Sequence, residues 1–433
     1  MVRNTYITAA AALLLLLAAL PGQAMIDGLE GNSFQFTAKD GHISTPDGPS
    51  VYFWGYSDDN GSGAVQYPGP TLILEQGVPV TIELRNTIPD KGTADPTDLI
   101  PVSIVFPGQS VMASGGQEGL LTREAVLPTD VVTYEFTPAE PGTYLYHSGT
   151  RPDLQIEMGL FGAIIVRPIG FDPMMPAMRK AYAEDWTRYD REFLFLQSEM
   201  DVRPHKLAEF GHIDQIDTAD YFPVWWFLNG RCAMDTMGAP GTELLEAQPY
   251  NCMPMMHPGE KVLMRVIGAG RDLHPFHHHG NDSTVIARDG RVLKTAGGAT
   301  SATQRVFTIQ TVPGETVDAL FEWTGEGLGW DIYGHAPGDP LQPYEDPNDH
   351  GKPFPVVLPE QANLTFGGLW SGSPFLGALG ALPPGEGGLN PNGGYTYMWH
   401  SHTEKELCNY DIFPGGLMTM LIIEHWDVDL GMH

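Results

Sequence analysis

Basic side chains are scarce in this sequence of 433 residues. It contains 23 Lys and Arg against 53 Asp and Glu, so its formal net charge at pH 7 is −30. Binding to nucleic acid requires clustered Lys and Arg that neutralise phosphates. The composition therefore excludes nucleic acid as a partner. A strong negative charge keeps a protein soluble, and it can also attract metal cations.

Long apolar runs are confined to the first 24 residues. Arg3 provides a basic start, residues 7–20 are mostly Ala and Leu, and Gly22-Gln23-Ala24 has the small-residue spacing of a cleavage site. This pattern predicts a signal peptide over 1–24. The alternative is an uncleaved anchor, because the run approaches the ~17 residues that span a bilayer. We expect export to the periplasm or the extracellular space, with no membrane contact once the signal is removed.

Cysteine is also rare, with three in the whole chain. An odd number in an exported protein leaves at least one thiol without an intramolecular partner. Cys232 and Cys252 flank a loop that contains Gly and Pro, and we predict a disulfide between them. Cys408 is then the remaining free thiol.

Helical patterns are few, whereas Gly and Pro make up about a fifth of the chain. This favours short strands between many turns and predicts an all-β fold of two sandwich domains. The domains are expected over 25–170 and 191–433, with a short helical connector over 171–190 (helical pattern at 176–191) and a Pro/Gly-rich insertion over 336–393. Strands are predicted at 33–38, 51–55, 79–85, 131–137, 162–166, 192–197, 261–267, 283–288, 316–322 and 418–424.

Two short segments contain closely spaced histidines. One reads His-Pro-Phe-His-His-His-Gly over 274–280, and the other reads His-Ser-His over 400–402. If each segment is a strand, side chains two residues apart share a face. The pairs that share a face are then His277 with His279 and His400 with His402.

Imidazoles side by side provide half of a tetrahedral or trigonal metal site. Ligand sets made only of nitrogen suit copper, zinc or nickel, and spacing does not choose between these metals. A single histidine such as His147, within Tyr-Leu-Tyr-His-Ser-Gly, is on its own more typical of a hydrogen-bonded core or loop residue.

The order of these motifs resembles the multicopper oxidase family of cupredoxin domains. The stretch 142–166 is similar to the family's second histidine motif, and 274–280 matches its HPxHxHG motif. Trp-His-Ser-His over 399–402, followed by Gly415-Gly416 and Met418, takes the place of the HCH motif. The resemblance covers essentially the whole mature chain. It implies cupredoxin-like Greek-key β-sandwiches and copper as the cofactor.

In that family eight histidines hold a three-copper cluster, and a type 1 copper passes electrons to it. The resemblance implies that His277 lies at the type 2 copper. It also implies that His147 and His402 share one type 3 copper, and that His279 and His400 share the other.

Three of the eight ligands are missing. The family's HWHG motif should lie near 103–109, where no His occurs, and Gly149 stands at the second His of the HSH motif. Each implied copper has therefore lost one imidazole. Candidate substitutes elsewhere in the sequence are His278, His335, Glu404, Glu406 and Asp411.

The type 1 site departs further from the family. Ser401 stands where the Cys that supplies the thiolate belongs, and 403–406 lacks the following His. His274 keeps the remaining type 1 His position, and Met418 or Met420 is a candidate axial ligand. We therefore expect the electron-entry site to be lost.

Two other groups of soft ligands are present. Cys408 could replace the missing thiolate only after a loop rearrangement. The loop 252–257, with Met234 and Met237 nearby in sequence, offers thioethers that suit Cu(I). Methionines in loops are, however, more typical as gap-fillers at interfaces.

The sequence thus predicts an exported multicopper-oxidase-like protein that binds copper through a reduced histidine cluster. As an oxidoreductase it would act on a small reducing substrate and dioxygen. The alternative is a non-catalytic copper-binding or structural protein that docks to an envelope or extracellular partner. His147 belongs to the first domain and the other four ligands to the second, so we expect the site where domains meet. Two-domain relatives form it between subunits of a trimer, which implies a homotrimer.

Overall fold

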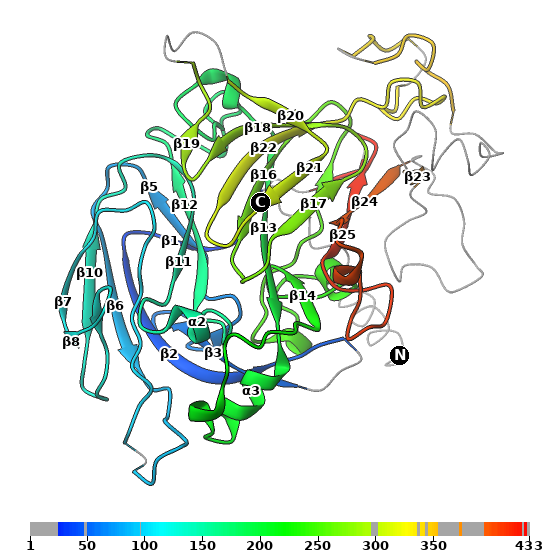
Figure 1. Cartoon of the computed structure of the whole chain (residues 1–433). Coiled ribbons are helices and arrows are strands. Elements are labelled where there is room, and N and C mark those ends of the chain that lie inside the picture. Colours follow the sequence, from blue (N-terminus) through cyan, green and yellow to red (C-terminus); the bar gives the residue numbers. More distant parts are fainter. Residues whose placement is uncertain are drawn as a thin grey trace, which may run out of the picture.

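The computed structural model describes residues 25–46, 50–95, 97–295, 302–335, 338–342, 345–353, 372–374, 394–426 and 428–430. The predicted signal peptide and most of the insertion 336–393 lie outside these residues. In the described part, strands form two pairs of sheets, one from the blue and teal half of the chain and one from the green to red half (Figure 1). No helix of the described residues is long and apolar enough to cross a membrane.

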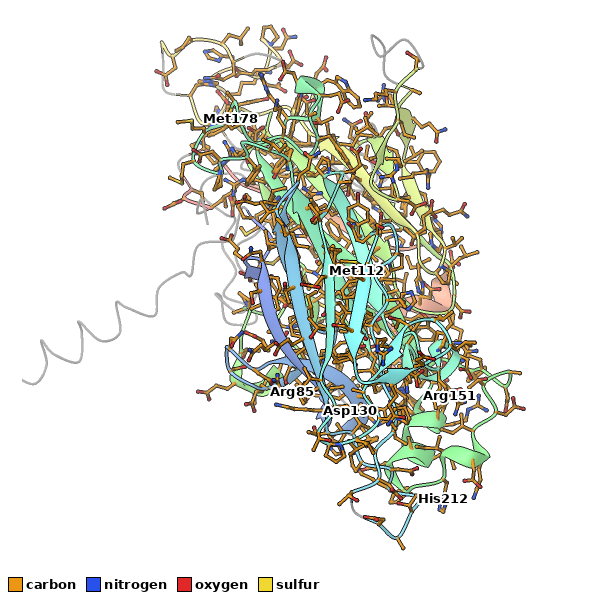
Figure 2. The ribbon with its side chains drawn as sticks, turned by 90° about the vertical axis from the view of Figure 1, so that its left-hand side faces the viewer. Arg85, Met112, Asp130, Arg151, Met178 and His212 are labelled. Carbon is orange, nitrogen blue, oxygen red and sulfur yellow. The ribbon has the colours of Figure 1, made fainter. Side chains whose placement is uncertain are left out.

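The first pair of sheets packs around an aromatic and aliphatic core. In β6 (Val80–Asn86), Val80, Ile82 and Leu84 are buried while the residues between them are partly exposed. This alternation arises because one face of the strand packs on the core and the other faces solvent. The outermost strand, β7 (Met112–Gly115), carries the exposed Met112 (Figure 2).

The strands of this unit pair in the following orders. One sheet is β4 (Val65–Gln66), β3 (Val51–Asp58), β2 (Ser33–Ile43), β6, β10 (Val132–Phe136), β7, and the other is β1 (Leu29–Glu30), β5 (Leu72–Glu75), β12 (Phe161–Arg167), β11 (Gly142–His147); β8 (Gln117–Glu118) pairs with β9 (Arg123–Glu124).

The second pair of sheets contains the histidine-rich strands β17 (His274–His278) and β24 (Tyr395–Ser401). Its core is rich in Trp, Tyr and Phe, including Phe276 and Trp399 from these two strands. Its first sheet runs β14 (Trp225–Leu228), β13 (Arg191–Met200), β16 (Lys261–Gly268), β22 (Thr316–Glu322), β18 (Ser283–Arg288), β19 (Arg291–Val292), with β20 (Gln304–Val306) on β18. Its second sheet runs β15 (Met255–Met256), β25 (Met418–Ile423), β24, β17, β21 (Thr308–Thr311), with β23 (Ser373–Pro374) on β24.

Strand β11 joins the two units. It is buried on both faces except at its last residue, His147, because it pairs with β12 on one side and packs against β16 and β22 of the second unit. Thr143 in this strand donates a hydrogen bond of 2.6 Å to Asp318 and accepts one of 3.0 Å from Arg265. The second unit therefore presents its β16–β22 sheet to the first unit and its β17–β24 sheet away from it.

Two expectations from the sequence are wrong. The stretch 176–191 does not form an α-helix, because its polar and aromatic residues fold into turns around one short 3-10 helix, η2 (Asp185–Thr187). The disulfide is not formed either: Cys232 and Cys252 are both buried free thiols, and they pack in two different hydrophobic clusters.

The helical elements of the described residues are short. They are α2 (Pro152–Gln155), α3 (Val202–Glu209), η2, η3 (Ile213–Gln215), η4 (Asp235–Met237), η5 (Glu243–Leu245) and η6 (Glu404–Leu407). All ten predicted strands are formed, with ends that differ from the prediction by a few residues at most. The all-β prediction is confirmed.

Candidate metal centre

The pairing of β17 with β24 brings four histidines onto one face. His277 lies directly opposite His400 in the antiparallel register. His279 is two residues further along the chain from His277. The backbone amide of His402 continues the ladder by donating to the carbonyl of Pro275 at 2.8 Å, so His402 follows His400 onto the same face. The sequence prediction that each pair shares a face agrees with this register.

Three of these imidazoles are close enough to share one metal ion, and the fourth, His402, packs beside them. The ring centroid of His277 lies 4.7 Å from that of His279, 5.5 Å from that of His400 and 5.0 Å from that of His402. The Nε2 atoms of His279 and His400 are 3.3 Å apart. His277, His279 and His400 each offer one ring nitrogen within 4.8 Å of the others.

Hydrogen bonds to the other ring nitrogens orient two of these rings. Nδ1 of His400 donates to the carbonyl of Ser401 at 2.6 Å, and Nδ1 of His277 lies 3.0 Å from the hydroxyl of Thr308. A histidine held in this way presents the lone pair of Nε2 to its surroundings, as metal-binding histidines do.

Burial and mutual repulsion favour the neutral form of His277 and His400. Burial lowers the pKa of His277 to about 4, with a further contribution from the neighbouring histidines. Burial also lowers the pKa of His400 to about 4. Neutral imidazole is the form that binds a metal ion, so the donor set fits a metal such as copper.

The cluster faces away from the core of its own sandwich. Phe276 and Trp399 point into that core, whereas His277 and His279 are half-buried and the side chain of His402 is 55% exposed. Phe307, which is 56% exposed, stacks edge-on against His277 at 5.8 Å. Because β16 and β22, not β17 and β24, face the first unit, the first unit does not cover the histidine face in the described part of the chain.

The fifth predicted ligand, His147, does not join this cluster in the single chain. It ends β11 in the first unit, and the group whose ring nitrogens lie within 4.8 Å of one another contains His277, His279 and His400 only. His402 still packs its ring 5.0 Å from that of His277, whereas His147 makes no ring contact with the group among the described residues. Its Nδ1 donates to the carbonyl of Ser148 at 2.9 Å, the same arrangement as in His400. Burial lowers the pKa of His147. His147 is therefore oriented like a ligand but separate from the other four.

The segment 103–109, where the resemblance places the first histidine motif, runs beside His147. The backbone amide of Val105 donates to the carbonyl of His147 at 2.8 Å, and the reverse bond is 3.2 Å. A Cβ atom on Gly149 would lie 2.7 Å from Val105 Cγ1 and 3.1 Å from Ser103 Oγ. The space of the missing histidine is thus filled by Val105 and Ser103.

At the type 1 position, His274 is held by two carboxylates. The ring is fully buried, with Nε2 2.9 Å from Glu199 Oε2 and Nδ1 2.9 Å from Glu406 Oε2. Burial by itself lowers the pKa of His274, but the hydrogen bonds to both carboxylates raise it to about 10. An imidazolium that donates from both nitrogens has no lone pair for a metal. The sequence offered no signal for Glu199 beyond its being an acid within a strongly apolar strand.

The other predicted type 1 groups do not rebuild the site. Met418 pairs in register with His400, and cross-strand partners share a face. It therefore lies on the opposite face from Ser401. Cys408 is a partly buried free thiol, and both nitrogens of His274 are already taken by carboxylates. The predicted loss of the electron-entry site agrees with this geometry.

The candidate substitute ligands lie in different places. His278 points into the core, where its Nε2 accepts a hydrogen bond of 3.1 Å from the backbone of Ser283. His335 belongs to a separate cluster. Glu404 approaches the four-histidine face, with Oε1 3.3 Å from Nδ1 of His402. Glu406 is engaged with His274.

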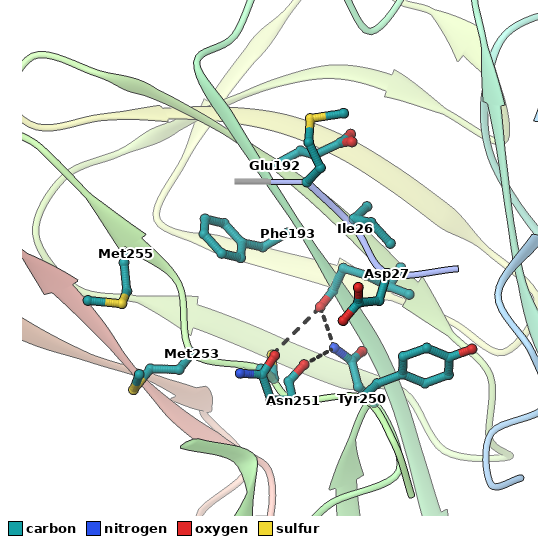
Figure 3. A pocket seen from close by; sticks show the side chains of 12 residues that line it. Ile26, Asp27, Glu192, Phe193, Tyr250, Asn251, Met253 and Met255 are labelled. Carbon is teal, nitrogen blue, oxygen red and sulfur yellow. Dashed lines mark hydrogen bonds between the residues drawn. The ribbon is translucent and has the colours of Figure 1, made fainter. Parts of the chain in front are cut away.

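The methionine-rich loop lines a pocket between the N-terminal segment and the second unit. Met253 and Met255 lie on one side of this pocket, and Asp27 and Tyr250 lie on the other (Figure 3). The thiol of Cys252 is buried and 3.6 Å from the carbonyl of Leu194. Burial raises the pKa of Cys252, so this thiol is poorly suited to binding Cu(I).

Comparison with known proteins finds similar sequences and similar folds. A multicopper oxidase family model matches residues 39–170. Copper resistance protein A of Escherichia coli is 24% identical over 287 residues, which cover 60% of this chain and 42% of that protein. Multicopper oxidase MCE of Talaromyces pinophilus is 32% identical over 126 residues, which cover 29% of this chain and 19% of that protein. The chain thus aligns with less than half the length of these curated relatives.

Solved structures show the same fold over nearly the whole chain. The multicopper oxidase mgLAC aligns with a TM-score of 0.53 at 17% identity, covering 92% of this chain and 87% of its own. The blue copper oxidase from Nitrosomonas europaea aligns with a TM-score of 0.52 at the same identity and coverage.

The fold and the strand-borne histidines define a cupredoxin-type protein. Residues 39–170 match the multicopper oxidase family, and this match, the relatives and the shared fold together support a divergent cupredoxin-type protein with copper as its implied cofactor. The divergence lies in the missing first histidine motif, in Gly149, and in the type 1 position that Ser401 and the carboxylate-bound His274 occupy.

Proposed function

We propose that this protein is an exported, copper-dependent oxidoreductase that works without a type 1 copper. Copper would be held by His277, His279, His400 and His402, with His147 supplied by a second copy of the chain. The observation that carries the proposal is the convergence of imidazoles on one face of β17 and β24, with Nε2 atoms of His279 and His400 3.3 Å apart.

A second copy is proposed because each half of the site is incomplete and flanked by exposed apolar side chains. Phe307 is exposed beside His277. Near His147, Thr122 lies 3.5 Å from the position of a Cβ on Gly149, and the preceding Leu121 is 59% exposed. Exposed apolar side chains around a functional site are typical of a protein interface. A homotrimer is the assembly that the family resemblance implies.

Bound copper would supply one-electron exchange between a small reducing substrate and dioxygen. The residues of the chain would orient it: Ser401 and Thr308 fix the rings of His400 and His277 through their second nitrogens. Phe307 would limit water at one side of the cluster. Because the His274 position carries no metal ligand, the reductant must reach the histidine cluster directly. Small substrates, such as phenols, fit this requirement better than a protein electron donor.

The test is to load the protein with Cu(II) and measure copper per chain, the visible spectrum and electron paramagnetic resonance. We expect bound copper with nitrogen couplings and without the intense blue absorption of a copper thiolate. His277→Ala and His400→Ala should each weaken copper binding by at least ~10-fold, the lower range seen when groups that merely orient a ligand are removed. His42→Ala, which removes an exposed histidine bound to Glu209, is the matched control.

Oxygen uptake with a phenolic reductant then separates the two functional candidates. Uptake that is lost in His277→Ala and kept in His42→Ala supports the oxidoreductase. Full copper loading without oxygen uptake would favour the non-catalytic copper-binding protein, which the absence of three family histidines also favours. Failure to bind copper at all would contradict both.

A further inference from the structure

A second group of potential metal ligands lies at the base of the insertion. Asp331 and His335 follow the second unit's buried Trp330, and Glu345 and His350 come from the described part of the insertion. Each of the four residues offers one ligand atom, and these atoms all lie within 4.8 Å of one another. None of the four is part of the histidine cluster on β17 and β24.

The contacts within this group are short and mostly buried. Nδ1 of His335 lies 2.8 Å from Asp331 Oδ2 and 3.2 Å from Glu345 Oε1, and Nδ1 of His350 lies 3.0 Å from the same Glu345 oxygen. The side chains of Asp331, His335 and Glu345 are at most 6% exposed. The two imidazole rings are 4.5 Å apart.

Neighbouring backbone groups hold two of these side chains in place. Asp331 Oδ1 accepts from the amide of Tyr333 at 2.9 Å, and Oδ2 accepts from the amide of Gly351 at 2.7 Å. Nε2 of His350 donates to the carbonyl of Asp339 at 3.1 Å. This bond leaves Nδ1 of His350 directed at the group, which is how metal-binding histidines are commonly oriented.

We propose that Asp331, His335, Glu345 and His350 bind a zinc ion. Two imidazole nitrogens and two carboxylate oxygens form a tetrahedral ligand set that suits Zn²⁺. The two carboxylates carry a charge of −2, which a divalent cation balances. In tetrahedral zinc sites the ligand atoms are about 3.3 Å apart, so the observed contacts need only small shifts to accept the ion.

Ion pairs alone explain the geometry less completely. The single N–H at Nδ1 of His335 can be well aligned with only one of its neighbouring oxygens of Asp331 and Glu345, although both lie within 3.2 Å. A cation in the centre satisfies all of these lone pairs at once. With four protein ligands and no open position, the ion would have a structural role.

The site would join two segments of the chain. The amide of Asp331 donates to the carbonyl of Lys352 at 2.9 Å, and the amide of Gly329 donates to Asp349 at 2.9 Å. Zinc would add a cross-link between 331–335 and 345–350. It would thereby fix the start of the insertion to the second unit, independently of the proposed copper site.

The experiment uses the full mature chain, stripped with a chelator and reloaded with ZnCl₂, then desalted for metal analysis by mass spectrometry. The histidine cluster on β17 and β24 could also take zinc, so the comparison is made in His277→Ala/His400→Ala. We expect about one zinc per chain in that variant, and at least ~10-fold less once His335→Ala/His350→Ala is added to it. Glu345→Gln, which preserves shape, should weaken zinc binding while the chain stays folded. His42→Ala is again the control.

Two measurements on the wild-type protein accompany the metal analysis. Zinc should raise the Tm of the stripped wild type by at least ~2 °C, and Co²⁺ in its place should give the visible bands of a tetrahedral N/O site. Equal zinc content in His277→Ala/His400→Ala with and without His335→Ala/His350→Ala, or a Tm that zinc leaves unchanged, would overturn the proposal and leave His–carboxylate ion pairs. Loss of copper binding in His277→Ala/His400→Ala with zinc retained keeps the two sites distinguishable.

Discussion

At the scale of single residues, the clearest departure from the family pattern is His274. A copper ligand position has become a buried imidazolium between Glu199 and Glu406, with both ring nitrogens 2.9 Å from a carboxylate oxygen. Removing one member of a buried ion pair leaves an uncompensated charge. Loss of either partner would therefore be costly, at a position where the family has a redox metal.

The stability contributed by His274 should depend on pH. Its pKa in the folded protein, about 10, lies above the ordinary value of 6.5, so its contribution is fully present below about pH 6.5 and is lost as the pH rises through about 10. The pKa of Glu199 is lowered by the same pair despite its burial. Its contribution is therefore present above its ordinary pKa and lost as the pH falls through the lowered value.

We predict that His274→Gln lowers the free energy of unfolding by ~3–5 kcal/mol near pH 6, the range for a broken buried ion pair. The difference from the wild type should shrink above pH 9. Denaturant unfolding across this pH range measures it, with His42→Gln as the surface control. A difference that stays constant up to pH 10.5 would argue against an imidazolium at this position.

A second prediction concerns Ser401. Restoring the family's cysteine with Ser401→Cys should not create a blue copper site, because His274 has no free nitrogen to complete it. The visible spectrum after loading with Cu(II) should lack intense thiolate absorption. Blue absorption in Ser401→Cys would mean that copper displaces the two carboxylates from His274.

At the scale of strands, β11 determines how the two units meet. Thr143 in β11 contacts Asp318 and Arg265 of the second unit, and Arg265 is also paired with Glu192 at 2.9 Å. Burial raises the pKa of Glu192, but Arg167 and Arg265 together lower it to about 2. The pairing of these buried charges fixes the position of His147 at the end of β11.

The loop after β11 explains why one family histidine is absent. Gly149→His should lower the free energy of unfolding by ~1–3 kcal/mol, as overpacking does, because its Cβ would lie 2.7 Å from Val105. Val105→Ala/Gly149→His should recover part of this loss. Thermal unfolding of both variants and of Val105→Ala alone measures the coupling. Additive effects of the two substitutions would contradict steric exclusion by Val105.

At the scale of the whole molecule, the proposed copper ligands lie in two places that one chain does not bring together. Among the described residues, His147 ends β11, and the other four lie on the face of β17 and β24 that points away from the first unit. Pairing of copies would complete the ligand set and cover Phe307 and Leu121. Assembly and copper binding should therefore depend on each other.

Leu121→Glu tests this dependence. We expect it to dissociate the assembly and to lower copper per chain, since a buried charge at an apolar contact is unfavourable. Ile169→Glu, which changes a residue that is 79% exposed in another part of the first unit, should have neither effect. Sedimentation measures the oligomeric state of each variant, and metal analysis on the same samples measures its copper per chain. Copper retained at full stoichiometry in a dissociated Leu121→Glu would contradict a shared site.

The local part of this organisation follows from the sequence. Alternation of apolar and polar residues predicted ten strands, and the i, i+2 spacing of histidines predicted that His277 and His279 share a face. These features depend on the backbone geometry of one strand. The expected helix over 176–191 failed because a weak helical pattern was outweighed by the turns that lead into β13.

Contacts between distant segments required the tertiary structure. The free thiols of Cys232 and Cys252 pack in separate clusters, which their spacing in sequence could not indicate. Sequence spacing likewise gave no sign that Glu199 and Glu406, more than two hundred residues apart, bind one histidine.

The chemistry that the chain can perform was therefore set by its residue types: histidines in pairs, a missing cysteine and an absent first motif. The strand register, the burial of each side chain and the direction of each strand face then decided which of those residues come together and which bind other partners. Strand pairing placed His277 opposite His400, and folding turned that face outward from the sandwich. Strand pairing and the direction of the face both depend on contacts between residues far apart in the sequence. The pKa of each histidine and its hydrogen-bond partners depend on the same packing.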